Sequence, residues 1–327
     1  MLTLHGRMAN AISDRTPGLP SGRQITIGHG EQRATIVEVG GAIRDYRVGD
    51  RALLDGFPAD EMCTGARGQT LLPWPNRVRD GRYAFADQAL QLALTEPKQH
   101  NAIHGLTRWA NWSVALEEPA RVVLRHRLHA QQGWPFVLDL ELEYALAGDG
   151  LTVRTSATNR GSKPCPYGAG AHPYLTLGAP TIDDAFLTIP ARTYLPTGAQ
   201  QIPIGRRAVD GGELDFRTPR RIGGTRIDFA FTDLERDADG RARVVLAAAD
   251  GSAAVALWVD EHYRFVELFT GDTLERADKR RTGLGVEPMT CPPNALQTGE
   301  ALVVLAPGES FTSRWGVEWR PADRADP

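Results

Sequence analysis

The sequence contains little that would connect it to a disulfide framework, a membrane or the secretory pathway. Its three cysteines, Cys63, Cys165 and Cys291, are far apart and odd in number. We therefore expect no disulfide framework, and a cytoplasmic location is the expectation. The longest apolar run, AAVALWV at 253–259, is far too short to cross a bilayer. The N-terminal segment lacks the apolar core of a signal peptide.

No charge of one sign dominates the chain. Lysine and arginine together number 37, aspartate and glutamate number 40, and the formal net charge is -3. A nucleic-acid-binding protein needs a basic excess or stripe, and a polybasic membrane anchor needs a cluster of cations. The balance predicts a small-molecule partner, with neither nucleic acid nor membrane, and leaves the oligomeric state open.

Motifs of several common chemistries are also missing. There is no H-E-x-x-H, no C-x-x-C and no Cys/His cluster, so no metal site is expected. GAGAHP at 168–173 lacks the third glycine of a dinucleotide-binding turn and leads into a proline. No G-x-S-x-G elbow offers a serine nucleophile. What remains is acid–base chemistry by histidine and carboxylate, without a cofactor.

Alternation with a period of two is the dominant pattern that is present. The segment 137–146 places one tyrosine and four leucines on one face and three acidic residues on the other: Leu138, Leu140, Leu142, Tyr144 and Leu146 against Asp139, Glu141 and Glu143. The segments 33–39, 121–128, 151–158 and 310–319 also alternate, and 242–260 reads as a hairpin. No long stretch has helical spacing. The pattern, with 34 glycines and 22 prolines, predicts an all-β fold, a large antiparallel β-sandwich.

The organisation along the chain is simple. Residues 1–22 are polar, contain two prolines and are predicted to form a flexible N-terminal arm. No composition shift, repeat or low-complexity tract divides the remainder. We therefore predict a single domain over 23–327.

The densest polar segment is LLPWPNRVRDGRY at 71–83. Pro73 and Pro75 stiffen the backbone around Trp74, and Asn76 and Arg77 follow. An aromatic ring, an amide and a guanidinium on a stiff loop suit a ligand rich in hydroxyl groups. The alternative is a surface turn with solvated arginines.

Two histidines lie beside small or stiff residues. His172 follows the small residues of YGAGA and precedes Pro173, while His104 precedes Gly105. Each has two interpretations, a packed or turn histidine and a polar group facing a ligand. The local sequence alone does not decide between them.

Three carboxylates lie among apolar neighbours. Glu287 stands between Val286 and Pro288, and the proline favours extended geometry at Glu287. Desolvation there would raise the carboxyl pKa and suit it to act as a general base near neutral pH. The alternative is an exposed loop glutamate. Asp228, in TRIDFAF, could orient a ligand hydroxyl or cap a turn, and Glu267, in RFVELF, is a further buried-carboxylate candidate.

Five segments resemble, in order and spacing, those of the aldose 1-epimerase family, the galactose mutarotase-like proteins. They are LLPWPNRVRDGRY, NAIHG, GWPF, GAHPYL and EPMTCPPNAL, and the resemblance covers roughly residues 24–320. It implies a galactose mutarotase-like β-supersandwich. It also implies an isomerase that interconverts the anomers of free hexoses such as glucose or galactose in carbohydrate metabolism, without a cofactor.

The resemblance implies a role for each candidate residue. His172 becomes the general acid and Glu287 the general base, and the two are expected to flank one cavity about a sugar ring apart. Sugar contacts are implied for four further residues: Arg77, His104, Asp228 and Asn76.

Two alternatives stay open at this point. One is an epimerase of a phosphorylated or sulfonated sugar, for which Arg79, Arg82 and Arg108 could supply cations. The other is a non-catalytic carbohydrate-binding protein. A binder has no need of a matched acid and base.

Overall fold

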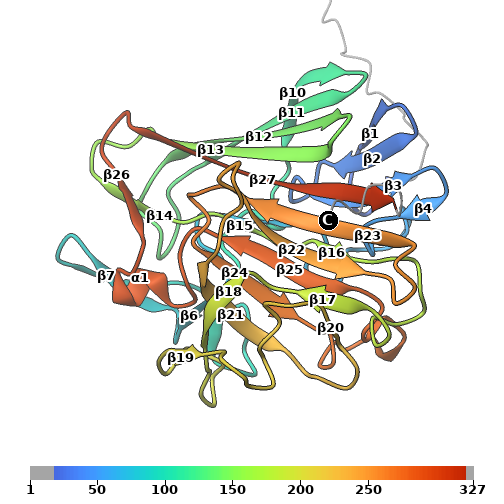
Figure 1. Cartoon of the computed structure of the whole chain (residues 1–327). Coiled ribbons are helices and arrows are strands. Elements are labelled where there is room, and N and C mark those ends of the chain that lie inside the picture. Colours follow the sequence, from blue (N-terminus) through green and yellow to red (C-terminus); the bar gives the residue numbers. More distant parts are fainter. Residues whose placement is uncertain (1–17, 322–327) are drawn as a thin grey trace, which may run out of the picture.

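The computed structural model describes residues 18–321, whose regular secondary structure is almost entirely antiparallel strands (Figure 1). The helices within that range are α1 (Ala295–Thr298) and one turn of 3-10 helix (Ala277–Lys279). The predicted all-β fold is confirmed. Residues 1–17 of the predicted arm lie outside the described residues, and the division into an arm and a single domain stays a prediction.

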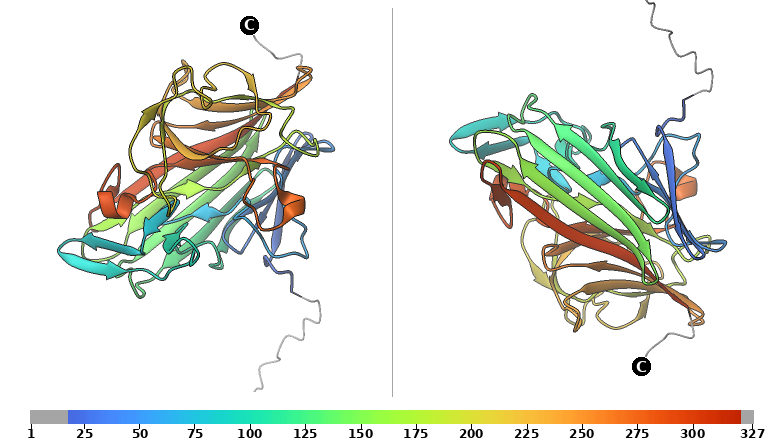
Figure 2. Two further views of the ribbon diagram at one scale, coloured as in Figure 1. Left: turned by 90° about the horizontal axis from the view of Figure 1, so that it is seen from below. Right: turned by 90° about the horizontal axis from the view of Figure 1, so that it is seen from above.

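The largest sheet has nine strands in the order β10-β11-β12-β13-β27-β23-β22-β17-β20. Their bounds are β10 (Ser113–Glu118), β11 (Arg121–Leu128), β12 (Leu138–Ala147), β13 (Gly150–Asn159), β27 (Ser310–Pro321), β23 (Ala253–Val259), β22 (Ala242–Ala247), β17 (Phe186–Thr188) and β20 (Arg220–Arg221). The alternating segment forms β12, where the leucines are buried and Glu141 and Glu143 pair with Arg154 of β13 on the other face. The view from above in Figure 2 shows β12 and β13 beside the long β27.

The second sheet has eight strands and carries the candidate site. Its order is β19-β18-β21-β24-β25-β15-β5, and β16 also pairs with β25. The bounds are β19 (Arg207–Ala208), β18 (Ala191–Leu195), β21 (Asp228–Leu234), β24 (Phe265–Phe269), β25 (Leu284–Met289), β15 (Gly170–Ala171), β5 (Thr70–Leu71) and β16 (Tyr174–Leu175). All six residues of β25 are buried, so this strand does not alternate between buried and exposed positions.

Smaller sheets complete the structure. A four-stranded sheet contains β1 (Gln24–His29), β2 (Gln32–Val37), β3 (Ile43–Val48) and β4 (Arg51–Ala52). Three two-stranded pairs are β14 (Cys165–Tyr167) with β26 (Val303–Leu305), β6 (Arg77–Arg79) with β9 (Asn101–Ile103), and β7 (Arg82–Phe85) with β8 (Gln88–Gln91).

One continuous cluster of buried apolar side chains joins the three largest sheets. It includes Ile25 of β1, Leu142 of β12, Leu257 of β23 and Val286 of β25. Burial of a side chain of this size contributes roughly 1.5–3 kcal/mol, so the cluster holds the sheets together and fixes the strands that carry polar groups. No helix within residues 18–321 is long and apolar enough to span a membrane.

Candidate active site

The six predicted site residues lie around one cleft beside the eight-stranded sheet. The cleft has a volume of about 200 Å³. Its walls include all six: Asn76, Arg77, His104, His172, Asp228 and Glu287. Pockets for drug-sized ligands measure about 300–1,000 Å³, so this cleft is sized for a smaller molecule such as a single sugar ring.

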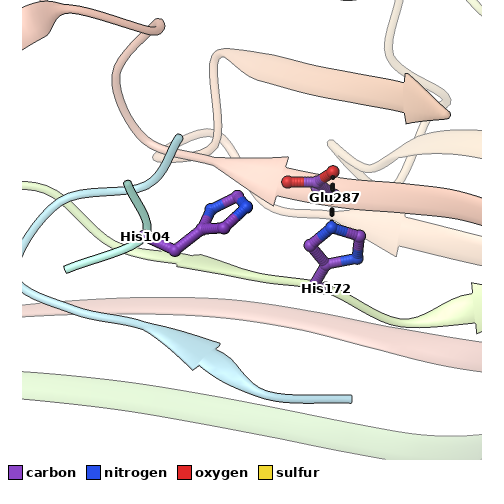
Figure 3. A group of neighbouring side chains, drawn as sticks. All are labelled: His104, His172 and Glu287. Atoms are coloured by element: carbon purple, nitrogen blue, oxygen red, sulfur yellow. Dashed lines mark ion pairs between the residues drawn. The ribbon is translucent and has the colours of Figure 1, made fainter. Parts of the chain in front are cut away.

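His172 and Glu287 face each other across neighbouring strands. Gly170 pairs with Met289 and Tyr174 with Gly285, so the antiparallel register sets His172 opposite Glu287. Nε2 of the imidazole lies 3.1 Å from Oε1 of the carboxyl (Figure 3). The expectation that the two groups stand a sugar ring apart is therefore wrong, because strand pairing brings them into direct contact.

Burial controls the charge of this pair. The two residues are 5% and 3% exposed. Desolvation, with smaller effects from neighbouring arginines, lowers the pKa of His172 to about 3, and desolvation raises the pKa of Glu287 well above its usual range. Both shifts favour the uncharged forms, so the pair as a whole is neutral near pH 7 and holds one transferable proton.

His104 is fixed by a reciprocal pair of bonds to Asn76. The Asn76 backbone N–H donates to His104 Nδ1 at 3.2 Å, and the His104 backbone N–H donates to the Asn76 carbonyl at 2.9 Å. A backbone N–H can only donate, so Nδ1 of His104 must be the acceptor. Burial lowers the pKa of His104 well below its usual value. The ring is therefore neutral with its proton on Nε2, and that N–H is a donor for a ligand.

The same bond argues against a metal at this place. Ligand atoms of His104, His172 and Glu287 all lie within 4.8 Å of one another, a spacing that a metal ion could use. However, Nδ1 of His104 already accepts the Asn76 N–H, and Nε2 carries the proton. A metal at Nδ1 would break this bond directly, and a metal at Nε2 would move the ring proton to Nδ1 and break it as well. The group therefore suits hydrogen bonding to a polar ligand better than metal coordination.

Arg77 is held in place by a carboxylate that sequence reasoning missed. Its Nε and Nη2 bind Glu96 in a two-pronged contact, with distances of 2.9 and 3.0 Å, and Asn101 Nδ2 donates to the same carboxylate at 2.9 Å. A guanidinium has five N–H groups, so those not directed at Glu96 remain free to donate to a ligand. Asp228, at the start of β21, accepts a bond of 2.9 Å from Gln201 Nε2 and completes this wall.

His172 packs against a second group that sequence reasoning missed, formed by Tyr174 and Arg67. The Tyr174 ring stacks on the imidazole at 5.0 Å with an interplanar angle of 16°. The Arg67 guanidinium lies 4.5 Å from the centre of the Tyr174 ring and pairs with Asp55 at 3.2 Å. Tyr174 could be suspected from its position in the H-P-Y segment, whereas nothing in the local sequence distinguishes Arg67.

Trp74 and Trp109 lie in different environments. Trp74 was considered as part of a ligand loop, yet it is 2% exposed and packs on Trp134 at 5.7 Å. Trp109, by contrast, is 54% exposed. The rigid loop thus anchors itself in the core with Trp74 and presents Asn76 and Arg77 to the cleft.

The comparisons with known proteins agree on one family. The aldose 1-epimerase family model matches residues 23–317. The uncharacterized protein YihR of Escherichia coli is 32% identical over 290 residues, covering 88% of this chain and 91% of that protein. Human galactose mutarotase is 27% identical over 255 residues, covering 72% and 73%. The structure of the aldose epimerase homologue from C. elegans superposes with a TM-score of 0.82 at 17% identity, covering 91% and 99%.

Proposed function

The chain belongs to the aldose 1-epimerase family, and on this premise we propose that it interconverts the α and β anomers of a free hexose such as glucose or galactose. The contact between His172 and Glu287 in a cleft of sugar size carries the proposal. Ring opening of a hemiacetal needs one proton removed and one added at neighbouring oxygens. An acid and a base side by side meet that need.

The proposed mechanism uses the single transferable proton of the pair. When the sugar binds, this proton resides on His172, and the Glu287 carboxylate faces the C1 hydroxyl. Glu287 removes the hydroxyl proton while His172 donates its proton to the ring oxygen, and the bond between C1 and the ring oxygen breaks. The open-chain aldehyde rotates about its C1–C2 bond and closes on the other face, with the two roles reversed.

Neighbouring donors favour the charged form of the base. Arg77 and Arg108 both lower the pKa of Glu287 and so oppose the effect of burial. The Nε2–H of His104 and the free N–H groups of Arg77 can bind sugar oxygens on which negative charge develops. Asp228 and the Asn76 amide would hold further hydroxyl groups. All three cysteines are buried and free, which supports the proposed cytoplasmic location.

Anomer exchange measured by NMR exchange spectroscopy tests the proposal. Catalysed exchange of α- and β-glucose or galactose at micromolar enzyme is the expected result. A non-catalytic carbohydrate-binding protein would bind the sugar and leave the exchange rate at its buffer value. That result would contradict the proposal.

A second candidate function is epimerisation of an anionic sugar, and Arg108 is the observation that favours it. The guanidinium lines the cleft and is half-buried. Its Nε donates to Gln69 at 2.9 Å, and within residues 18–321 no carboxylate forms an ion pair with it. A phosphate or sulfonate group of the substrate could supply the negative charge that pairs with Arg108. Arg79 and Arg82, the other cations considered, are exposed and do not line the cleft.

The two candidate functions predict different preferences among sugars. An anionic-sugar epimerase would exchange a sugar phosphate or sulfonate with a kcat/KM at least tenfold above that for glucose or galactose. An enzyme for free hexoses would show the opposite order, and the charged sugars would not inhibit it.

A further inference from the structure

A second glutamate stands directly beside the proposed base. Glu267 lies in the middle of β24, and its Cα pairs with that of Glu287 across β24 and β25. Opposite residues of an antiparallel pair project from the same face, with Cβ atoms about 4.5–5.5 Å apart. His172, Glu287 and Glu267 therefore form a row across three neighbouring segments of the sheet. Both glutamates are 3% exposed.

No hydrogen bond within residues 18–321 stabilises a negative charge on Glu267, and Oε2 of its carboxyl is fully enclosed. The charged groups that face it are Glu287 from β25, Asp228 from β21 and Arg77 from β6. Arg77 lowers the pKa of Glu267, but its guanidinium also pairs with Glu96, and the opposite effects of burial and Asp228 are larger. An ionised Glu267 would thus be a buried anion next to two further carboxyl groups.

Two carboxyl groups this close cannot both ionise in a buried site. Burial first, and Asp228 second, raise the pKa of Glu267 to about 8. Burial first, and Glu267 second, raise the pKa of Glu287. The proposed mechanism requires Glu287 to become a carboxylate during each turnover. This can happen only while Glu267 keeps its proton.

We propose that Glu267 acts as a protonated carboxylic acid, a positioning residue whose neutral side chain permits Glu287 to ionise and whose deprotonation turns epimerisation off. The inference rests on the proposed function. Once Glu267 is ionised, its charge keeps the proton on Glu287, and Glu287 then cannot accept the proton of the sugar hydroxyl. The enzyme would thus have an alkaline limit set by a residue that does not itself exchange protons with the substrate.

The pH profile of kcat/KM in Glu267→Gln tests this role, because glutamine keeps the shape and stays neutral. We expect a rate within about threefold of wild type at pH 6.5, since the base itself is intact. We expect the alkaline midpoint to rise by about one pH unit, because one of the coupled titrating groups is gone. Glu267→Asp retains a titrating carboxyl and should retain the alkaline limit.

Two results would overturn the proposal. A loss of about 100-fold at every pH in folded Glu267→Gln would mean that a carboxylate is needed at this position. An unchanged alkaline midpoint would mean that Glu267 does not titrate in this range.

A second measurement does not depend on the substrate. In protein labelled with ¹³C at the glutamate carboxyl, wild type should show one carboxyl that titrates near pH 8, and Glu267→Gln should lack it. Absence of that signal in wild type contradicts the proposal even where anomer exchange is observed. If wild type shows the signal but exchanges no anomers, the proposed function fails and the protonated state of Glu267 stands.

Discussion

Nε2 of His172 and Oε1 of Glu287 lie 3.1 Å apart because the two residues occupy opposite positions in one antiparallel register. The separation of acid and base is therefore a property of strand pairing and not of loop conformation. A sugar that engages both groups replaces their mutual contact with contacts of its own. The first prediction concerns this pair.

We expect His172→Asn and Glu287→Gln each to lower kcat for anomer exchange by roughly 10²–10⁴-fold, the usual contribution of a positioned acid or base. Because the two act as a unit, the double variant should lose little more than the worse single variant. Exchange spectroscopy measures the rates. His126→Asn, outside the cleft, is the matched control. Near wild-type rates in either single variant would refute the assigned roles.

The Nε2–H of His104 gives a second prediction. His104→Ala should raise KM or lower kcat by roughly 10–100-fold, through loss of one donor to a polar ligand. Long-range ¹⁵N–¹H correlation spectra of wild type should show the Nε2–H tautomer of a neutral ring from pH 5 to 8. His100→Ala alters an exposed histidine that pairs with Asp80 and should leave the rates unchanged. A charged His104 at pH 6 would contradict the geometry.

Arg108 gives the third prediction, which separates the two candidate substrates. If the natural sugar is anionic, Arg108→Gln should lower kcat/KM for a sugar sulfonate or phosphate by roughly 10–100-fold, the effect of one bond to a charged group. With glucose the same change should cost less, because Arg108 then acts only through its effect on the pKa of Glu287. Arg79→Gln, an exposed position outside the cleft, serves as the control. Equal losses for charged and neutral sugars would assign Arg108 a general role in the site.

The fourth prediction concerns stability against pH. The pKa of Glu267 is about 8 in the folded chain against a usual value of 4.5. The unfolded chain releases this proton above about pH 4.5, whereas the folded chain keeps it up to about pH 8. The free energy of unfolding is therefore highest below pH 4.5 and falls as the pH rises from 4.5 to 8. Glu267→Gln should therefore exceed wild type in free energy of unfolding at pH 8.5 by up to a few kcal/mol. At pH 4 the two should be nearly equal, which urea unfolding at both pH values can check.

The glycines before His172 give the fifth prediction. A Cβ at Gly170 would lie 2.7 Å from Pro75 Cβ and 3.0 Å from the Pro288 carbonyl oxygen. Gly170→Ala should cost about 1–3 kcal/mol of stability, the range for overpacking. It should also reduce activity, because both contacted segments carry site residues. Gly148→Ala, where no atom lies within 4 Å of the added Cβ, should do neither. Thermal unfolding and exchange rates measure both effects.

These glycines also mark the limit of sequence reasoning. Small residues directly before a candidate site histidine could leave space for an approaching ligand. Gly168 and Gly170 instead allow Cys291, Pro75 and Pro288 to pack closely against the backbone. Neither glycine lines the cleft. Close approach of backbone segments and access for a ligand require the same residue types. Only the three-dimensional contacts distinguish them.

The strands were predictable where one face of the strand is buried and the other is exposed to solvent. The alternating segments 121–128 and 151–158 correspond to Arg121–Leu128 and Gly150–Asn159. The site strand β25 does not alternate, because the core covers one face and the cleft residues cover the other. The sequence consequently left an exposed loop position open for Glu287, which the structure places in a buried strand. Its contact with His172 depends on a register between segments more than a hundred residues apart, which local patterns do not encode.

The position of β27 has a consequence for biosynthesis. This strand, residues 310–321, lies between β13 and β23 near the middle of the nine-stranded sheet. Of the strands described, it is the last to leave the ribosome. Until it emerges, β13 and β23 have unpaired edges, and the nine-stranded sheet is divided in two. The nine-stranded sheet can therefore close only after residues 310–321 have been synthesised, and until then its two unpaired edges can pair with the wrong strands.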